Sequence, residues 1–204
     1  MGNELGEPID IKNAHEHVFG AVLLNDWSAR DIQQFEYVPL GPFLGKNFGT
    51  TISGWIVTME ALEPFRCPSI VQDPVPCEYL RGGPNDAYDV QLAVEWHVGG
   101  EKQRVATSNL KYLYWSIYQQ LSHHTVNGCN MRTGDLLGTG TISGPGAGES
   151  GSFLELTMNG ANSVQVGSHT RTWVENGDAI SLIAQCQNSG VRLGFGECIG
   201  SIRK

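Results

Sequence analysis

The stretch VFGAVLLNDWSARD, residues 18–31, decides how we expect the chain to fold. Residues 18–24 form a continuous apolar run, which is typical of a strand buried on both faces. Ser28 is a favourable helix N-cap with Asp31 three residues after it, so we predict a short helix over residues 29–34. Asp26 therefore lies at the corner between a buried strand and a helix.

Outward from this corner, loops and short strands dominate. Residues 39–49 (PLGPFLGKNFG) are dense in Gly and Pro and predict a loop without regular structure. Residues 51–58 are expected to be extended, and residues 64–84 to form surface turns. Residues 88–98 alternate apolar and polar side chains, as a half-buried strand does. Residues 108–124 carry an apolar stripe at helical spacing and predict the one long helix, capped by Ser108 or Asn109.

The C-terminal third predicts short strands between glycine turns, over residues 135–137, 140–142, 152–158, 179–185, 191–195 and 199–202. Asn159-Gly160 and Asn176-Gly177 are strong tight-turn signals. Because no linker or internal repeat interrupts the chain, we predict one domain over residues 1–204. Its expected fold class is β-rich α+β, with one or two helices packed on sheets.

Composition narrows the function. The 204 residues carry a formal net charge of −8, and Lys and Arg do not cluster. Nucleic acids and anionic membrane surfaces both need a basic face, so neither is an expected partner. The five cysteines are scattered without CxxC spacing, which is typical of free thiols in a reducing compartment. With no apolar run long enough to span a membrane, we expect a cytosolic protein.

Asp26 is a candidate ligand for a hard divalent cation, because such ions prefer oxygen ligands held on rigid elements. The alternative is that Asp26 only caps the following helix. Arg30 and Gln33 follow at helical spacing, with Tyr37 beyond them. An Arg beside a carboxylate could stabilise an anionic intermediate or bind a substrate carboxylate, although an ordinary surface helix explains the spacing equally well.

Further candidates lie in two glycine-rich loops. Lys46 and Thr50 belong to LGKNFGTT, where flanking glycines allow close approach to a ligand, although a solvated loop lysine is the usual alternative. Thr141 lies in GTGTISGP, residues 138–145, whose hydroxyls and amides could bind a carboxylate. Glu155, in FLEL, either is an exposed strand residue or orients a catalytic histidine. His123 and His124 are better explained as residues at a helix C-terminus.

Four segments together carry a family resemblance. They are VFGAVLLNDWSARDIQQFEYVPLGPFLGKNFGTTIS at residues 18–53, YLYWSIYQQLSHHTVNGCNMRTGDLLGTGTISGP at 112–145, GSFLELTMNG at 151–160 and VRLGFGECIG at 191–200. In this order they closely resemble the C-terminal catalytic part of the fumarylacetoacetases, over essentially the whole chain. The resemblance implies a mixed β-sandwich roll, here incomplete at its N-terminal side, and a homodimer.

The same resemblance implies the catalytic and metal-binding residues. Asp26 matches a ligand of the divalent metal, Mg²⁺ or Ca²⁺, while Lys46 and Thr50 match positions at the metal site. Lys46 also faces the substrate in the family. Arg30 matches an arginine that stabilises the carbanion-like leaving group, and Glu155 matches the acid that pairs with the catalytic histidine.

Gln33, Tyr37 and Thr141 match positions that contact the substrate. The implied reaction uses water to split 4-fumarylacetoacetate into fumarate and acetoacetate, the last step of tyrosine and phenylalanine breakdown. A divalent ion would polarise the diketone, and Lys and Arg donors would stabilise the departing enolate. Two alternatives remain: a related acylpyruvate hydrolase, or a non-catalytic product that dimerises or binds a partner.

In this family the catalytic histidine, a second metal aspartate and a Glu-x-Glu ligand pair precede the segment that matches Gly2, as does an SH3-like domain. His15 and His17 do not replace the family's base. We therefore expect the 204-residue chain alone to bind Mg²⁺ weakly and to show no detectable hydrolysis. Micromolar Mg²⁺ affinity by titration calorimetry, or turnover of fumarylacetoacetate followed by ultraviolet absorbance, would contradict this.

Overall fold

A five-stranded antiparallel sheet forms the centre of the computed structural model, which describes residues 2–203. Its strands are β7 (Gln91–Val98), β8 (Glu101–Asn109), β11 (Ala179–Gln187), β12 (Arg192–Gly194) and β13 (Cys198–Ser201). One edge of β11 pairs with β7, while β12 and β13 pair with successive parts of its other edge. The long strands β7 and β8 are joined by Gly99 and Gly100, both at positive φ as a tight hairpin requires.

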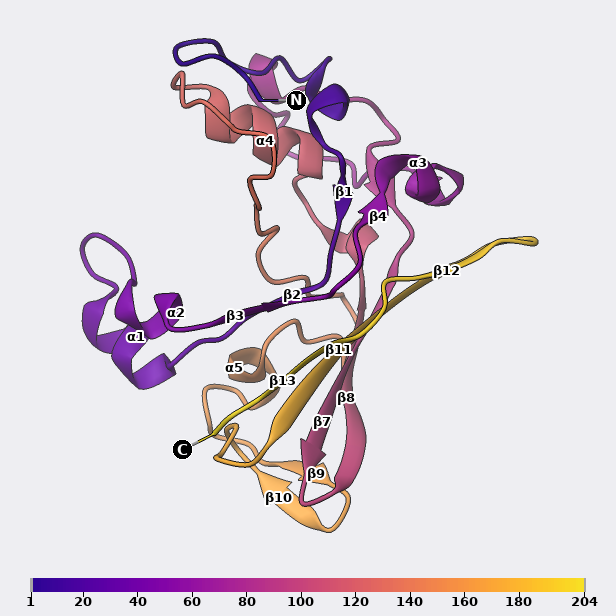
Figure 1. The fold of residues 1–204 in the computed structure, drawn as a ribbon. Coiled ribbons are helices and arrows are strands. Elements are labelled where there is room, and N and C mark those ends of the chain that lie inside the picture. The colour runs from indigo at the N-terminus through magenta and orange to yellow at the C-terminus, as the bar shows by residue number, and fades with distance from the viewer. Residues whose placement is uncertain (1, 204) are drawn as a thin grey trace.

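One end of this sheet closes over a small core. Trp96 is fully buried and packs with Val98, Val166 and Ile180. The hairpin of β9 (Val164–Val166) and β10 (His169–Arg171) and the single turn α5 (Phe153–Leu156) cover this end (Figure 1). The rings of Trp96 and Phe153 lie 4.4 Å apart, so the helical turn is packed directly onto the sheet.

A larger core fills the opposite end, around Leu62, Phe65, Tyr88, Tyr118 and Leu121. The Tyr88 and Tyr118 hydroxyls share a buried hydrogen bond of 2.7 Å. The elements around this larger core are η1 (Ala14–His17), α3 (Met59–Leu62), η2 (Glu63–Phe65), β5 (Arg66–Cys67), η3 (Glu78–Leu80), β6 (Ala87–Tyr88), η4 (Leu110–Tyr112) and α4 (Ile117–Thr125).

A projecting arm, residues 24–52, extends from the side of the body (Figure 1). Its base is the antiparallel pair of β2 (Leu24–Asp26) with β3 (Thr50–Ile52), and its tip holds α1 (Arg30–Glu36) and α2 (Leu44–Asn47). Next to the base of the arm, β1 (Gly20–Ala21) pairs with β4 (Val57–Thr58) and continues the same hairpin into the body. The chain thus leaves and re-enters the body through two short strand pairs.

The α+β class is confirmed, but the run at residues 18–24 is not one strand buried on both faces. It divides into β1 and β2, which pair with β4 and β3 outside the five-stranded sheet. Within residues 18–24, Leu23 is buried whereas Phe19 is 73% exposed, so the run is not covered on both faces. The helix expected at residues 29–34 is present as α1. The loop expected at residues 39–49 contains the short helix α2.

The helix expected over residues 108–124 begins later. Asn109 still pairs with Gln91 at the end of β8, a strand the sequence pattern did not indicate. Asn109 caps only the short η4, whereas Ser116 caps α4 in a reciprocal capping box with Gln119. Cross-strand pairing therefore takes Ser108 and Asn109, the first residues of the predicted helix, into β8.

The strands expected at 179–185, 191–195 and 199–202 are confirmed as β11, β12 and β13. The strand expected at residues 152–158 is wrong: this stretch contains α5, whose N-cap Ser152 accepts a hydrogen bond from the Glu155 amide. Residues 135–137 and 140–142 form no strand, and β9 and β10 were not foreseen. Four-residue apolar alternation is too short to separate a strand from a helical turn.

Asp178 is the most heavily bonded buried charge in the body, with a residue exposure of 2%. It accepts hydrogen bonds from Arg171 at 3.0 and 3.2 Å, from the Trp96 indole at 3.1 Å and from the Glu175 amide at 3.0 Å. Burial alone would raise the pKa of Asp178. These donors outweigh burial and hold the pKa below its usual value of 3.8.

We expect Asp178→Asn to lower the free energy of unfolding by about 2–4 kcal/mol, because Arg171 loses its buried partner. The pKa of Asp178 is lower in the folded chain than in the unfolded one. Its ionised form therefore stabilises the protein above pH ~4, and this contribution is lost as pH falls below that value. Urea denaturation at pH 7 and pH 3 measures both effects. The exposed Asp73→Asn is the control, and an equal loss in both variants would contradict the assignment.

Candidate functional site

Strand register brings the first two candidate residues together. In the β2–β3 pair, Asp26 lies directly opposite Thr50. Cross-strand partners project to the same face of a pair, so a residue at the end of β2 and one at the start of β3 share one site. The Trp27 indole donates to the Thr51 hydroxyl at 2.8 Å, which ties the two strands beside this position.

Lys46 completes this group from the tip of the arm. Its ammonium donates to Asp26 Oδ2 at 2.8 Å and to the Ser28 hydroxyl oxygen at 2.8 Å. Asp26 does not cap α1, because the N-cap is Ala29 and makes no side-chain cap bond. The predicted N-cap Ser28 is also wrong, since its hydroxyl donates to the Asp26 carbonyl at 3.0 Å. Ser28 was missed as a site residue, although it directly follows the Asp26-Trp27 pair.

Arg30, Gln33 and Tyr37 follow along α1 and its C-terminal end. The Arg30 guanidinium donates to Gln33 Oε1 at 2.8 Å, an internal contact that fixes both side chains. All three residues line the same large cavity as Asp26, Lys46 and Thr50. The arm therefore presents a lysine, an arginine, an amide and a phenol toward one space.

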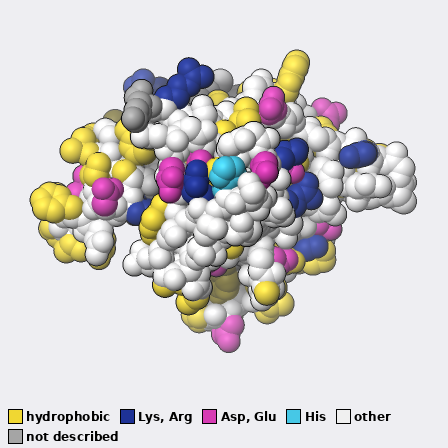
Figure 2. All heavy atoms as spheres, turned by 90° about the horizontal axis from the view of Figure 1, so that it is seen from below, with side chains coloured by type: hydrophobic (Ala, Val, Ile, Leu, Met, Phe, Trp, Pro, Cys, Tyr) yellow, Lys and Arg dark blue, Asp and Glu magenta, His cyan; other side chains and the backbone are white. Residues whose placement is uncertain are grey.

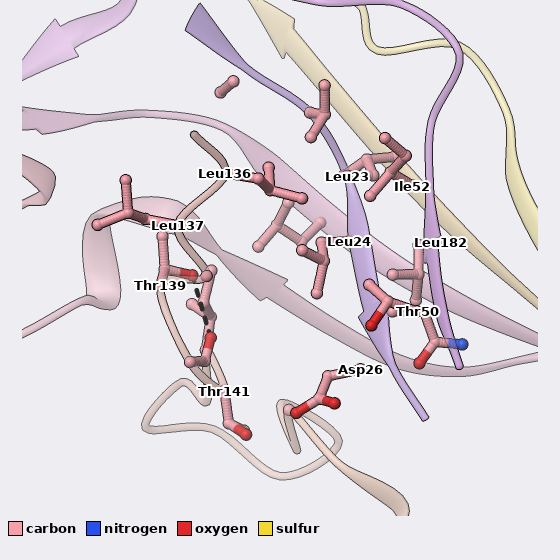
Figure 3. Close-up of a pocket in the computed structure, with 18 of the residues that line it drawn as sticks. Leu23, Leu24, Asp26, Thr50, Ile52, Leu136, Leu137, Thr139, Thr141 and Leu182 are labelled. Atoms are coloured by element: carbon pink, nitrogen blue, oxygen red, sulfur yellow. Dashed lines mark hydrogen bonds between the residues drawn. The ribbon is translucent and has the colours of Figure 1, made fainter. Parts of the chain in front are cut away.

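The opposite wall of this cavity is the glycine-rich loop 138–142. Figure 3 shows Asp26 and Thr141 reaching into the space from different walls, with Thr139 beside them. The view also shows Thr50 on the side of Asp26, and the apolar side chains of Leu24, Leu136 and Leu137. The space measures about 2580 Å³, which exceeds the usual few hundred to thousand cubic ångströms of a small-ligand pocket. It is an open hollow between arm and body.

Glu155 does not join this group. It lies in α5, and its Oε2 accepts hydrogen bonds from the Ser143 hydroxyl at 2.6 Å and the Gly151 amide at 3.0 Å. Those contacts fix the 143–151 loop, which continues from the cavity wall. His123 instead shares a 2.9 Å hydrogen bond with Tyr79, and His124 lies near the Cys129 thiol, so both have structural contacts.

The donor set around Asp26 does not by itself make a metal site. Residues 2–203 contain no group of three His, Cys, Asp or Glu side chains arranged to hold an ion. The nearest charged group to Asp26 is the Lys46 ammonium, which repels a cation. The five cysteines are all free thiols. Within the described part of the chain, no helix is long and apolar enough to cross a membrane.

We expect Lys46→Met to change the free energy of unfolding by less than about 1 kcal/mol, because the pair with Asp26 is exposed to solvent. The Lys46 and Asp26 side chains are 27% and 52% exposed. Lys111→Met, which removes an exposed pair with Asp89, is the matched control for thermal denaturation. A loss of several kcal/mol at Lys46 alone would make the pair a structural one.

Comparison with known proteins supports a single family. The model described as "Fumarylacetoacetate (FAA) hydrolase C-terminal" matches residues 1–203. A fumarylacetoacetase of Arabidopsis thaliana is 55% identical over 203 residues, covering 98% of this chain and 48% of that protein. The human fumarylacetoacetase is 52% identical over 204 residues, covering 98% and 49%. The chain thus spans about half the length of the curated relatives it matches.

Among solved structures, the protein described in "Crystal structures of Cg1458" has a TM-score of 0.49 and 17% identity, over 99% of this chain and 57% of that one. That similarity is too low to support a statement about function. The family match and the identities above 50% are sufficient without it. This chain belongs to the fumarylacetoacetate hydrolase family and corresponds to its C-terminal domain.

Proposed function

We propose that this chain forms one wall of a fumarylacetoacetase active site, which hydrolyses 4-fumarylacetoacetate to fumarate and acetoacetate in tyrosine and phenylalanine breakdown. The observation that carries the proposal is the contact of Lys46 with Asp26 and Ser28 in the lining of the cavity. It coincides with 52–55% identity to proteins named fumarylacetoacetase. A related acylpyruvate hydrolase remains the nearest alternative substrate class.

The chemistry explains these residue types. Cleavage of a carbon–carbon bond leaves a carbanion, which is a poor leaving group unless its charge is delocalised and stabilised. In the proposed complex, the Lys46 ammonium and the Arg30 guanidinium supply that positive charge. Gln33, Tyr37 and Thr141 would orient the substrate's polar groups through hydrogen bonds, on both walls of the hollow.

We further propose that the complete enzyme uses a divalent cation, Mg²⁺ or Ca²⁺, with Asp26 as one ligand and Thr50 and Lys46 beside it. Such an ion, when bound, polarises a ketone oxygen. The described residues do not fit this role alone, since Asp26 is held by an ammonium and no ligand cluster surrounds it. The other ligands would come from outside these 204 residues, as would a histidine for Glu155 to orient.

We propose that the family protein acts in the cytosol as a homodimer. Apolar side chains gather toward the arm's side of the molecule in Figure 2. Six apolar side chains of the arm are exposed by 57–97%: Phe35, Val38, Leu40, Phe43, Leu44 and Phe48. Exposed apolar groups of this kind usually mark a protein contact. They also support the second candidate function, a non-catalytic product that dimerises or binds a partner.

A chimera tests the proposed activity. The half of the Arabidopsis relative that this chain does not match would be joined to residues 2–204, which restores a full-length protein. We expect the chimera to hydrolyse fumarylacetoacetate, measured by the loss of ultraviolet absorbance. We expect Lys46→Met and Asp26→Asn to lower kcat by about 100-fold or more, because each removes charge from the reacting groups.

Asp73→Asn is the control, since Asp73 is an exposed carboxylate that does not line the cavity. It should leave kcat within a factor of about two, as surface changes usually do. A chimera with a native circular dichroism spectrum and no turnover would argue against this substrate. Full activity in Lys46→Met would remove Lys46 from the mechanism.

A further inference from the structure

Glu36, the last residue of α1, binds the start of α2 with its carboxylate. Oε1 accepts hydrogen bonds from the Phe43 amide at 2.8 Å and the Gly45 amide at 2.6 Å, and Oε2 accepts one from the Leu44 amide at 3.0 Å. Three consecutive backbone donors therefore converge on one side chain. Neither the sequence pattern nor the family resemblance pointed to this residue.

The helix that Glu36 caps has little support of its own. It spans four residues, and its N-cap Phe43 makes no side-chain cap bond. The first N–H groups of a helix need partners, and isolated short helices are unstable in water. Because the Leu40 and Phe43 side chains are largely exposed, apolar packing contributes little here. The Glu36 carboxylate is the main contact that fixes where α2 begins.

Lys46 depends on that position. The Gly45 carbonyl accepts a hydrogen bond from the Ala29 amide at 2.9 Å. A Cβ at Gly45 would lie 2.8 Å from the Gln33 nitrogen, so α2 fits against α1 with no space to spare. Lys46 comes next in the chain, and its ammonium reaches Asp26 and Ser28 from this turn.

The charge of Glu36 is suited to this contact. The Gly45 amide is the main cause that lowers the pKa of Glu36, and the Phe43 and Leu44 amides add to it. The carboxylate is therefore ionised at neutral pH. Charge-assisted hydrogen bonds of this kind are stronger than those between neutral groups.

We propose that Glu36 is a positioning residue: it fastens the start of α2 to the end of α1 and so holds the Lys46 ammonium at Asp26. Glu36 does not line the cavity, so its effect passes through the backbone of residues 43–45. The inference rests on the proposed role of Lys46, but it concerns position and not turnover. The positioning role of Glu36 can therefore be wrong while the proposed activity is right, and the proposed activity can be wrong while the positioning role is right.

Labelling of Lys46 tests the inference in the 204-residue chain. An amine-selective acetylating reagent is added briefly at neutral pH, and modification at Lys46 is measured by mass spectrometry. We expect Glu36→Gln to raise the Lys46 labelling rate about threefold or more, because an ammonium released from two hydrogen bonds is more accessible. Asp26→Ala combined with Ser28→Ala sets the value for a lysine released from both contacts, and labelling of Lys111 is the internal reference.

Glu60→Gln is the matched control, since Glu60 is an exposed glutamate on α3. It should leave Lys46 labelling unchanged. Hydrogen exchange at residues 43–45 is measured in parallel. Faster exchange at these amides in Glu36→Gln with unchanged Lys46 labelling would overturn the inference, because Glu36 would then only cap α2. If Glu36→Gln does not fold, Gly45→Ala decides, since it displaces α2 with Glu36 intact. Unchanged Lys46 labelling there would also overturn it.

Discussion

The pairing of β2 with β3 is the constraint on which the rest of the site depends. Its register sets Asp26 opposite Thr50, and the pair forms the base of the arm that carries Arg30, Gln33 and Lys46. A shift of one residue would turn each side chain of β3 to the other face of the pair. The Thr50 side chain would then point away from the site, and the position of Lys46 relative to Asp26 would change.

The structure separates stability from chemistry. The two apolar cores and the Asp178 network lie in the body, whereas the arm is held by three-residue strands and by the Glu36 contact. Surface pairs such as Lys46 with Asp26 contribute little to folding. Exposed apolar side chains such as Leu40, at the tip of the arm, gain nothing from the folding of this chain.

The sequence correctly predicted those helices and strands that depend on local residue patterns. The strand at 179–185 is confirmed, and so is a helix over residues 29–34, although its predicted N-cap Ser28 is wrong. The prediction was wrong where pairing between distant segments sets the secondary structure. Asn109, for example, pairs with Gln91 and ends a strand where a helix was expected. Residue type and spacing named the candidate site residues with alternatives left open, and the resemblance supplied their roles. The structure gathers all of them except Glu155 around one hollow. Ser28 and Glu36 could not be found, because their roles depend on backbone geometry that no residue pattern encodes.

Disulfide trapping of the strand register is the most direct measurement. Leu24 and Ile52 face each other across the β2–β3 pair, at the spacing of directly opposed residues. We expect Leu24→Cys with Ile52→Cys to form a disulfide on mild oxidation, identified by peptide mapping against the native thiols. Leu24→Cys with Thr50→Cys is offset by two residues and should not cross-link. Efficient cross-linking of the offset pair, with none of the opposed pair, would contradict the register and the site that is built on it.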